Sequence, residues 1–413
     1  MKKKIITIVI IVAVLLLLGG FYLWYNGNYA GKKSIELTTN PVMEYEWQKM
    51  ASDNGIVGDY LWQRTREYLV NECGSDGLIP SSYMIPGRLT TQPGQSSEEF
   101  LLEDQALLLK MYVKANERIA AINLKKTVEA NIDISAQNIT GRMAWLDACV
   151  SYYDAFGSKK DYEDILGQIN NLFDENGEII PESLYAATYQ QGAFTAMNDN
   201  GDVTAQDVNG TLSSPVGESE AEMFAFEGVS ISSINLRLIK DLENNGLLPS
   251  GSYELNLSLV KNAIVSNTIH LYAYAYTYSD GQVSYIYAYK TPAAIDVTES
   301  IRTMLNLQRV NELPEDCYIW IKNNIVNSGR LKSTYYLVTG STDGAEAVDA
   351  YIDILEISYL HDDRDLFERI CTIEGIRVAT YTNSPALSMV YREEDGRYVL
   401  YARENLGLSL MIY

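Results

Sequence analysis

The sequence predicts a mainly α-helical fold: a single helical toroid with one β-hairpin insert, preceded by one N-terminal transmembrane helix. About a dozen segments of the 413-residue chain repeat apolar residues at helical spacing. Clusters of Gly, Asn, Asp and Ser separate these segments, and short connections favour antiparallel packing of consecutive helices. Hydrophobic residues make up 47% of the chain, which excludes a mainly disordered protein.

The N-terminal residues predict a signal anchor. Lys2, Lys3 and Lys4 precede an uncharged, apolar stretch from Ile5 to Tyr25, which has the length of about 20 residues that a bilayer requires. The lysines favour a cytoplasmic N-terminus, which makes the main domain extracellular. A cleaved signal peptide is the alternative, but its apolar region would be shorter and would end in a small-x-small cleavage site. We therefore expect a single-pass protein of the cell membrane.

A short tether is expected between the anchor and the helical domain. Residues 26–41 are mostly polar and reach roughly 50 Å when fully extended, at about 3.3 Å per residue. The expected organisation is an anchor over residues 1–25, a tether over residues 26–41 and one domain over residues 42–413.

The segments of the domain fall into three classes of pattern. A β-hairpin is expected where His270–Tyr278 and Val283–Tyr289 alternate on either side of Ser279-Asp280-Gly281. The polar residues Asn198–Gly217 predict a long surface loop. Helices are expected over Val42–Ser52, Gly55–Cys73, Ser97–Ala115, Glu117–Asn131, Thr140–Phe156, Tyr162–Phe173, Glu218–Asn244, Glu254–Val265, Val297–Val310, Glu315–Asn327, Ala345–Leu360 and Arg364–Cys371.

The net charge of −22 limits the classes of partner. An acidic surface repels nucleic acid and anionic lipid, so binding to either is not expected, whereas neutral polymers and small molecules remain open. The four cysteines are far apart, and with two histidines they form no zinc motif. We therefore expect no metal and no cofactor.

Two carboxylates lie in an otherwise apolar helix. Within residues 96–112, Glu103 and Asp104 each share a helix face with apolar residues. Burying an ionised carboxylate without a partner costs several kcal/mol, so such a group shifts its pKa or takes a functional role. The alternative is structural, because the helix dipole stabilises a negative charge near a helix start.

Three segments carry a family resemblance: Leu102–Leu108, Thr140–Ala148 and Phe224–Ile231. In this order they resemble the general-acid segment, the Asp-rich helix start and the base-supplying segment of family 8 glycoside hydrolases. This is an inverting family of endoglucanases, chitosanases and exopolysaccharide hydrolases in the six-hairpin glycosidase superfamily. The resemblance implies an (α/α)6 barrel, which agrees with the number of expected helices.

The resemblance assigns the catalytic roles. It implies that Glu103 is the general acid and Glu227 the catalytic base, held about 6.5–9.5 Å apart with water between them. Four positions depart from the family pattern: Leu102 replaces Ser or Thr, Arg142 replaces an acidic residue, Glu227 replaces Asp, and Ser230 replaces Arg. For Glu227 the alternative is a partly exposed structural residue of the expected helix.

The candidate substrate-binding residues are Asp104, Arg142, Trp145, Tyr185 and Tyr189. Aromatic rings pack against the apolar faces of pyranose units, although Trp145 in a helix is also typical of a core residue. For Tyr185 and Tyr189, in an expected loop, the alternative is ordinary packing. Arg142 would lower the pKa of any carboxyl with which it pairs and would favour a structural ion pair over catalysis.

Together these patterns predict a membrane-anchored extracellular glycoside hydrolase that is inverting and endo-acting. Its expected substrate is a polysaccharide, and an exopolysaccharide made by the same cell is one candidate. The altered motifs leave an alternative open: a catalytically inactive glycan-binding or polysaccharide-export accessory protein on the same fold. The expected partners are a polysaccharide or oligosaccharide, the membrane through the N-terminal helix and, as a candidate, a polysaccharide synthase complex.

Overall fold

The computed structural model describes most of the domain and part of the N-terminal segment. Described are residues 18–20, 22, 25, 27–29, 32–38, 43–85, 95–187, 223–265, 269–279, 281–287, 294–337, 341–380, 384, 386–394 and 396–413. Within these ranges no helix combines the length and the apolar character that a membrane crossing requires. Most of the expected anchor and all of the expected loop Asn198–Gly217 lie outside the described residues.

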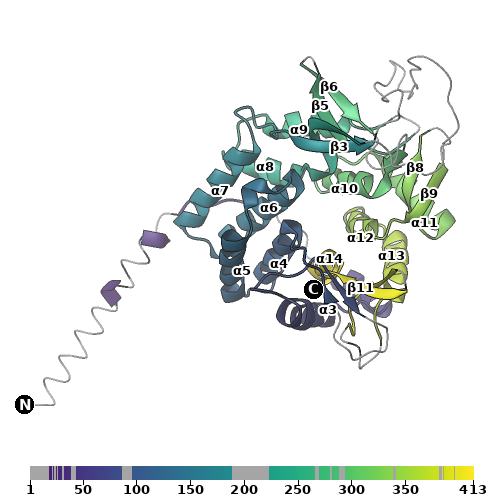
Figure 1. Ribbon diagram of the computed structural model, residues 1–413, viewed down its shortest axis with the longest axis horizontal. Coiled ribbons are helices and arrows are strands. Elements are labelled where there is room, and N and C mark those ends of the chain that lie inside the picture. Colours follow the sequence, from purple (N-terminus) through teal and green to yellow (C-terminus); the bar gives the residue numbers. More distant parts are fainter. Residues whose placement is uncertain are drawn as a thin grey trace, which may run out of the picture.

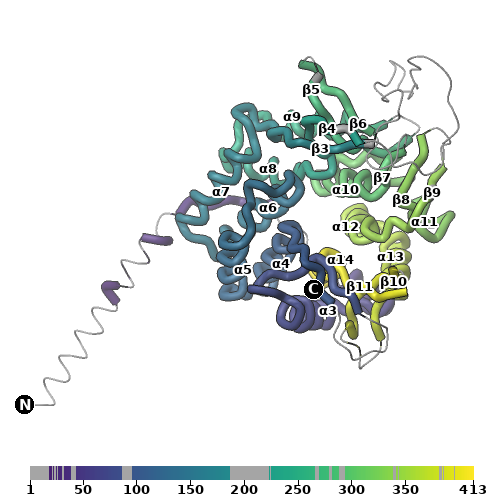
Figure 2. Tube along the Cα trace, viewed as in Figure 1, coloured from purple at the N-terminus to yellow at the C-terminus, as the bar shows by residue number. Residues whose placement is uncertain are grey.

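Helices form two concentric rings, and the chain passes once around them (Figures 1 and 2). The inner ring consists of α4 (Leu102–Lys114), α6 (Ile139–Phe156), α8 (Leu236–Asn244), α10 (Val297–Gln308), α12 (Ala350–Leu360) and α14 (Ala402–Ile412). Helix α4 packs against α6 and α14, α12 packs against α10 and α14, and α8 contacts α10. The ring is completed by the 3-10 turn η3 (Ile231–Ser233), which contacts α6.

The outer ring alternates with the inner one along the sequence. It consists of α3 (Gly58–Thr65), the π-helix η1 (Arg66–Glu72), α5 (Arg118–Asn131), α7 (Lys159–Leu172), α9 (Ser252–Lys261), α11 (Glu315–Ser328) and α13 (Arg364–Ile376). Helix α2 (Tyr45–Asp53) packs on α13. This alternation confirms the expected mainly α-helical toroid.

Three antiparallel sheets are attached to the rings, where the sequence predicts one hairpin. The first contains β10 (Arg392–Glu394), β11 (Arg397–Tyr401), β1 (Ser82–Ile85) and β2 (Gln95–Ser96), in that order. The second contains β3 (Glu182–Ala187), β4 (Met223–Ser230), β5 (Ala275–Ser279) and β6 (Gln282–Ile286). The third contains β7 (Ala294–Asp296), β8 (Lys332–Tyr336) and β9 (Ser341–Glu346).

The sheets lie where inner helices begin. Strand β11 leads directly into α14, and β7 leads directly into α10, where Asp296 caps the helix by accepting from the backbone N–H of Thr298 at 2.9 Å. The expected hairpin is confirmed as β5–β6, with Ala275 opposite Ile286 and Ser279 opposite Gln282. Because strands precede these helix starts, the sheets form the rim at one end of the ring.

One expected helix is wrong over half its length. The segment Glu218–Asn244 contains β4, η3 and α8 instead of one helix. Gly228 in β4 disfavours a helix, and its lack of a side chain allows the carbonyl oxygen of Tyr276 to approach, since a Cβ there would lie 2.5 Å from that atom. Backbone pairing of β4 with β3 and β5 therefore overrides the helical pattern.

Candidate active site at the mouth of the helical ring

The starts of four inner helices meet at one end of the ring, which we call the mouth. Arg403 in the first turn of α14 lies 3.8 Å from Glu103 of α4 and 3.8 Å from Asp353 of α12. On α10, Arg302 lies 3.5 Å from Glu299 and is influenced by the charges of Asp353 and Glu103. The opposite ends also coincide, because Lys114 at the end of α4 donates to the carbonyl oxygen of Leu410 in α14 at 2.6 Å.

Glu103 and Asp104 are adjacent but differ in accessibility. The side chain of Glu103 is 24% exposed, whereas Asp104 is buried, with 2% of the residue exposed. Burial raises the pKa of Asp104 well above its ordinary value, the charge of Glu103 adds to the rise, and Arg403 opposes it. The start of α4 therefore presents one accessible carboxyl group beside one whose neutral form is favoured.

Asp353 is a second buried carboxyl group at the mouth. Burial raises its pKa, although Arg403, Arg302 and Arg309 act in the opposite direction. Its Oδ2 atom has no hydrogen-bond partner within the described residues. A carboxyl group in this state is a candidate for proton transfer or for binding a polar ligand.

A layer of paired charges lies below the mouth. Lys110, seven residues and about two turns after Glu103, pairs with Asp147 of α6. Arg237 of α8 lies 3.4 Å from the same carboxylate. Burial alone would raise the pKa of Asp147, but Lys110 and Arg237 outweigh burial and hold this pKa below its usual range. This layer fills the ring with matched charges, so we assign it a structural role.

Glu227 lies on the rim instead of in a helix. It is exposed on β4 opposite Ser183 of β3, and its backbone carbonyl accepts from Thr277 at 2.6 Å. The neighbouring Glu182 accepts from the backbone N–H of Ile139, the first residue of α6, at 2.8 Å. Burial raises the pKa of Glu182, and the charge of Glu227 acts in the same direction.

These contacts place Glu227 at the end of the ring where α6 begins. Glu103 is grouped with Asp104 and Arg403 at the start of the adjacent α4. That the two glutamates face each other across one cleft stays a prediction.

The remaining candidate residues occupy different environments. Trp145 is completely buried in α6. Arg142 donates to the carbonyl oxygen of Asn171 at the end of α7, and its charge opposes the rise in the pKa of Glu182. Tyr185 is 57% exposed on β3, opposite Ala225 of β4. Tyr189 lies outside the described residues.

A hollow of about 230 Å³ opens beside the mouth, between β7–β9 and the starts of α10 and α12. Asp349 lines it, pairs with Arg392 at 2.6 Å and is influenced by Arg403 and Arg302. The arginines of the mouth therefore also act on a carboxylate that lines the hollow. Its other polar walls are Asp296, Thr298, Ser333, Thr334 and Glu346.

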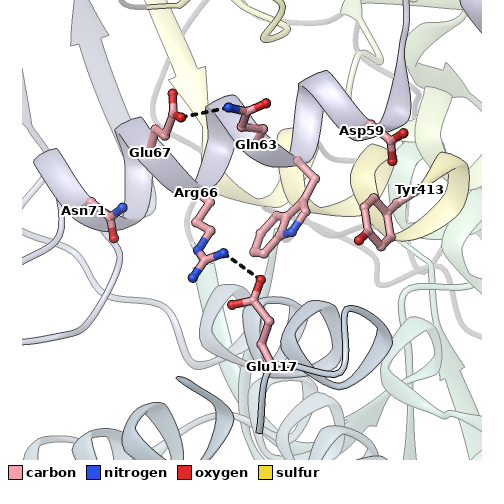
Figure 3. A pocket seen from close by; sticks show the side chains of 8 residues that line it. Asp59, Gln63, Arg66, Glu67, Asn71, Glu117 and Tyr413 are labelled. Carbon is pink, nitrogen blue, oxygen red and sulfur yellow. Dashed lines mark hydrogen bonds and ion pairs between the residues drawn. The ribbon is translucent and has the colours of Figure 1, made fainter. Parts of the chain in front are cut away.

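A larger groove of about 550 Å³ lies at the opposite end of the ring (Figure 3). Tyr413, which follows α14, and Glu117, which precedes α5, both line it. Arg66 of η1 pairs with Glu117 at 2.7 Å. None of the sequence-predicted site residues is among the residues that line this groove.

The cysteines and acidic residues show no metal-binding arrangement in the described ranges. No group of three or more His, Cys, Asp or Glu side chains is placed to hold a metal ion among these residues. All four cysteines, Cys73, Cys149, Cys317 and Cys371, are buried free thiols.

Sequence reasoning missed Asp353, Glu299, Arg302 and Arg403. The signal that identified Glu103 was present for Asp353, because Ala350–Leu360 is an apolar helix that carries only Asp353 and Glu356 as charges. The arginines offered no comparable signal, since their significance depends on which helices adjoin in the ring.

Comparisons with known proteins show similarity of fold. No protein-family model matches the sequence, and no curated protein sequence is similar to it. A solved structure described as a novel α-amylase from Clostridium perfringens has 15% identity and a TM-score of 0.59, covering 91% of this chain and 100% of that one. PssZ from Listeria monocytogenes has 10% identity and a TM-score of 0.50, covering 92% of this chain and 97% of that one.

More distant is the GH76A α-1,6-mannanase from Salegentibacter sp. HEL1_6, with 13% identity and a TM-score of 0.45, covering 89% of this chain and 98% of that one. At these identities the similarity concerns the fold. The solved structure described as an α-amylase shares the fold of this chain. The helical ring agrees with the expected toroid, and membership of family 8 stays a prediction.

Proposed function

We propose that the protein is a membrane-anchored extracellular glycoside hydrolase that cleaves a polysaccharide at the mouth of the ring by an inverting acid/base mechanism. The observation that carries the proposal is the carboxyl cluster of Glu103, Asp104 and Asp353, in which two groups have raised pKa values. General-acid cleavage of a glycosidic bond requires a carboxyl group that holds a proton, and burial at the mouth favours the neutral forms of Asp104 and Asp353.

Glu103 is the proposed general acid. Its exposed fraction makes it the accessible member of the pair at the start of α4, and burial raises the pKa of its neighbour Asp104. Glu103 donates its proton to the glycosidic oxygen as the bond from this oxygen to the anomeric carbon breaks. Glu227 is the proposed base, which accepts a proton from the water that attacks the anomeric carbon from the opposite face.

The placement of Glu227 supports this role in two respects. It is exposed on the rim, so water can reach it, and it lies beside Glu182 at the start of α6. Helix α6 packs against α4, which carries Glu103. A glycan that enters the mouth would therefore contact the strands of the rim and also the first turns of the inner helices.

A glycan-binding or polysaccharide-export accessory role is the second candidate. Arg403 lies 3.8 Å from both Glu103 and Asp353, and its charge acts to lower the pKa of Asp353. A cluster of carboxylates and guanidinium groups at the mouth can bind sugar hydroxyl groups without cleaving the glycan.

Product analysis separates the two candidates. The protein is incubated with β-glucans, chitosan, α-glucans, mannans and bacterial exopolysaccharides, and reducing ends are measured. The proposal expects release from at least one polymer, with an inverted anomeric configuration in the nascent product by NMR. Binding to a glycan without release would support the accessory role, and a retained configuration would contradict the assigned mechanism.

A further inference from the structure

A row of polar side chains follows the outer helix α3 and its π-helical continuation η1. Asp59, Gln63, Glu67 and Asn71 are spaced four residues apart, and all four line the groove of about 550 Å³ at the end of the ring opposite the mouth (Figure 3). Residues four apart on a helix have Cβ atoms about 5–6 Å apart. The groove is therefore bordered by amide and carboxylate groups with a regular repeat, which we call the polar row.

The π-helix η1 keeps this row on one side of the chain. Each residue of an α-helix turns about 100° around the axis, so positions four apart drift by about 40° per step. The turn of η1 is wider, because the backbone N–H of Cys73 bonds to the carbonyl oxygen of Tyr68, five residues earlier, at 2.9 Å. This wider turn offsets the drift and keeps Asn71 on the side of Asp59, and such turns are frequent at functional sites.

The opposite wall is held in place by a close contact between helices. Gly58 at the start of α3 lies against the end of α14, since a Cβ at Gly58 would be 2.7 Å from the carbonyl oxygen of Ile412. Tyr413, which follows α14, therefore lines the groove near Asp59 (Figure 3). Arg66 reaches across the groove to Glu117 at 2.7 Å, so polar groups face the groove from both walls.

Trp62 is the most deeply buried residue that lines the groove. It is 4% exposed, and its ring packs edge-on against the ring of Tyr112 with the centroids 5.9 Å apart. Its ring N–H has no hydrogen-bond partner among the described residues, and it is not one of the polar atoms that are sealed from solvent. A fixed aromatic ring whose free N–H opens on a polar groove suits a ligand with both apolar and hydroxyl surfaces.

Three further polar groups that line the groove have no internal partner. The carboxylate of Asp59, the side-chain amide of Asn71 and the hydroxyl of Tyr413 form no hydrogen bond or ion pair within the described part of the chain. A ligand that displaces water from these groups therefore breaks no bond within the protein.

Positive and negative charges balance around the groove. Arg64 lies 2.8 Å from Glu67, and Arg66 pairs with Glu117. The acidic side chains on the groove or next to it in sequence are Asp59, Glu67, Glu72 and Glu117, and the basic ones are Arg64, Arg66, Lys114 and Arg118. Since neither sign dominates, the groove does not attract a charged polymer and suits an uncharged ligand rich in hydroxyl groups.

We propose that this groove is a second, non-catalytic binding site for an uncharged oligosaccharide segment of a polysaccharide. A linear glycan presents hydroxyl groups once per sugar unit, which suits the repeat of the polar row, and Trp62 and Tyr413 supply the apolar contact. Helix α4, whose 13 residues span about 20 Å, separates the mouth from this end of the ring. The groove therefore holds a different stretch of polymer from the mouth, and its binding does not depend on the proposed hydrolysis.

Fluorine NMR of the full chain tests the site directly. The protein carries 5-fluorotryptophan and Glu103→Gln, which blocks cleavage under the proposed mechanism, and is held in a detergent without a sugar headgroup. The resonance that Trp62→Phe removes is assigned to Trp62. We expect this resonance to shift with at least one of cellohexaose, maltohexaose, mannohexaose and N-acetylchitohexaose, and not with the anionic hexagalacturonate. No shift with any of the four uncharged sugars, or an equal shift with hexagalacturonate, would overturn the proposal.

Two double variants locate the binding. Asp59→Ala with Asn71→Ala removes two exposed side chains without internal partners, so the fold should stand while the dissociation constant of the bound sugar rises about tenfold or more. Asp154→Ala with Asn170→Ala, which removes exposed side chains on α6 and α7, should leave this constant unchanged. Equal constants for the two double variants would refute the site.

Reducing-end release by the chain with Glu103 intact is measured separately. A protein that releases no sugar from any polymer but shifts the Trp62 resonance loses the proposed hydrolysis and keeps the second site. Release without a shift refutes the second site alone.

Discussion

The guanidinium of Arg403 lies 3.8 Å from the carboxylate of Glu103, at the point where α14 meets α4. The same side chain lies 3.8 Å from Asp353, so one cation contacts carboxyl groups from two other inner helices. Burial favours the neutral forms of Asp104 and Asp353, while Arg403 favours their ionised forms. The protonation of Asp104 and Asp353 is therefore set by a balance between burial and the charge of Arg403, and a single substitution can shift this balance.

The first prediction concerns that balance. Arg403→Gln removes a charge that lowers the pKa of both Asp104 and Asp353, so their neutral forms should persist to higher pH. In a plot of kcat/KM against pH, the limb that reports these two groups should move to higher pH. Arg403→Lys keeps the positive charge and should restore most of the original profile. Arg397→Gln, on the exposed strand β11, is the control. An unchanged profile, or a shift to lower pH, would show that Arg403 does not control the mouth.

The second prediction concerns stability and pH at Glu374 of α13. Burial raises its pKa from 4.5 to about 8, with Arg377 opposing the rise and Glu404 adding to it. Between these two values the folded protein holds a proton that the unfolded chain releases, so this group's stabilising contribution falls as pH rises. Glu374→Gln should therefore gain melting temperature relative to the wild type between pH 5 and pH 8.

Glu356→Gln provides the matched control for this measurement. Burial alone would raise the pKa of Glu356, but the paired Arg309, 2.7 Å away, outweighs burial and lowers it. This variant should lose stability at neutral pH and approach the wild type in acid. If both variants respond to pH in the same direction, the assigned difference in environment is wrong.

The third prediction concerns the layer of charges below the mouth. Asp147→Asn leaves Lys110 and Arg237 without their buried carboxylate partner, which should cost about 3–5 kcal/mol of unfolding free energy. Lys49→Gln, which breaks an exposed pair with Asp53 at 2.6 Å, should leave the same quantity nearly unchanged, because solvent screens the pair. Urea denaturation measures both, and a similar cost for the two would contradict the structural role of this layer.

The fourth prediction separates binding from packing among the aromatic candidates. Tyr185→Ala removes an exposed ring on the rim, so it should raise KM several-fold with little change in kcat or stability. Trp145→Ala should instead cost about 3–5 kcal/mol of unfolding free energy, because the side chain is completely buried. Tyr45→Ala, an exposed ring on α2, should affect neither. A normal KM for Tyr185→Ala would remove this residue from the binding site.

Much of the helical ring follows from sequence periodicity, and its exceptions have physical causes. The expected helices Val297–Val310 and Glu315–Asn327 correspond to α10 and α11 within two residues at each end. Helix α14 was missed because polar side chains occupy its core positions: buried Glu404 pairs with Arg377, and buried Asn405 bonds to the backbone of Val390 at 2.9 and 3.0 Å. Such partners lie outside the local sequence, so the amphipathic pattern is lost.

The site was only partly predictable for the same reason. An apolar helix interrupted by carboxylates identifies Glu103 and Asp104, whereas Arg403 gains its meaning from the contact of α14 with α4 and α12. Glu227 was expected in a helix and lies in β4, because pairing with β3 and β5 decides its conformation. Local pattern thus finds groups that are unusual in their own helix, and misses groups whose role depends on neighbouring helices.

The most direct test of the central claim compares Glu103→Gln with the wild type on a polymer from which the wild type releases reducing ends. Glu98→Gln, an exposed carboxylate four residues before α4, is the matched control. The account predicts that Glu103→Gln loses at least about two orders of magnitude in kcat while remaining folded, and that Glu98→Gln is unaffected. Release by Glu103→Gln at the full rate would show that this carboxyl group is not the acid.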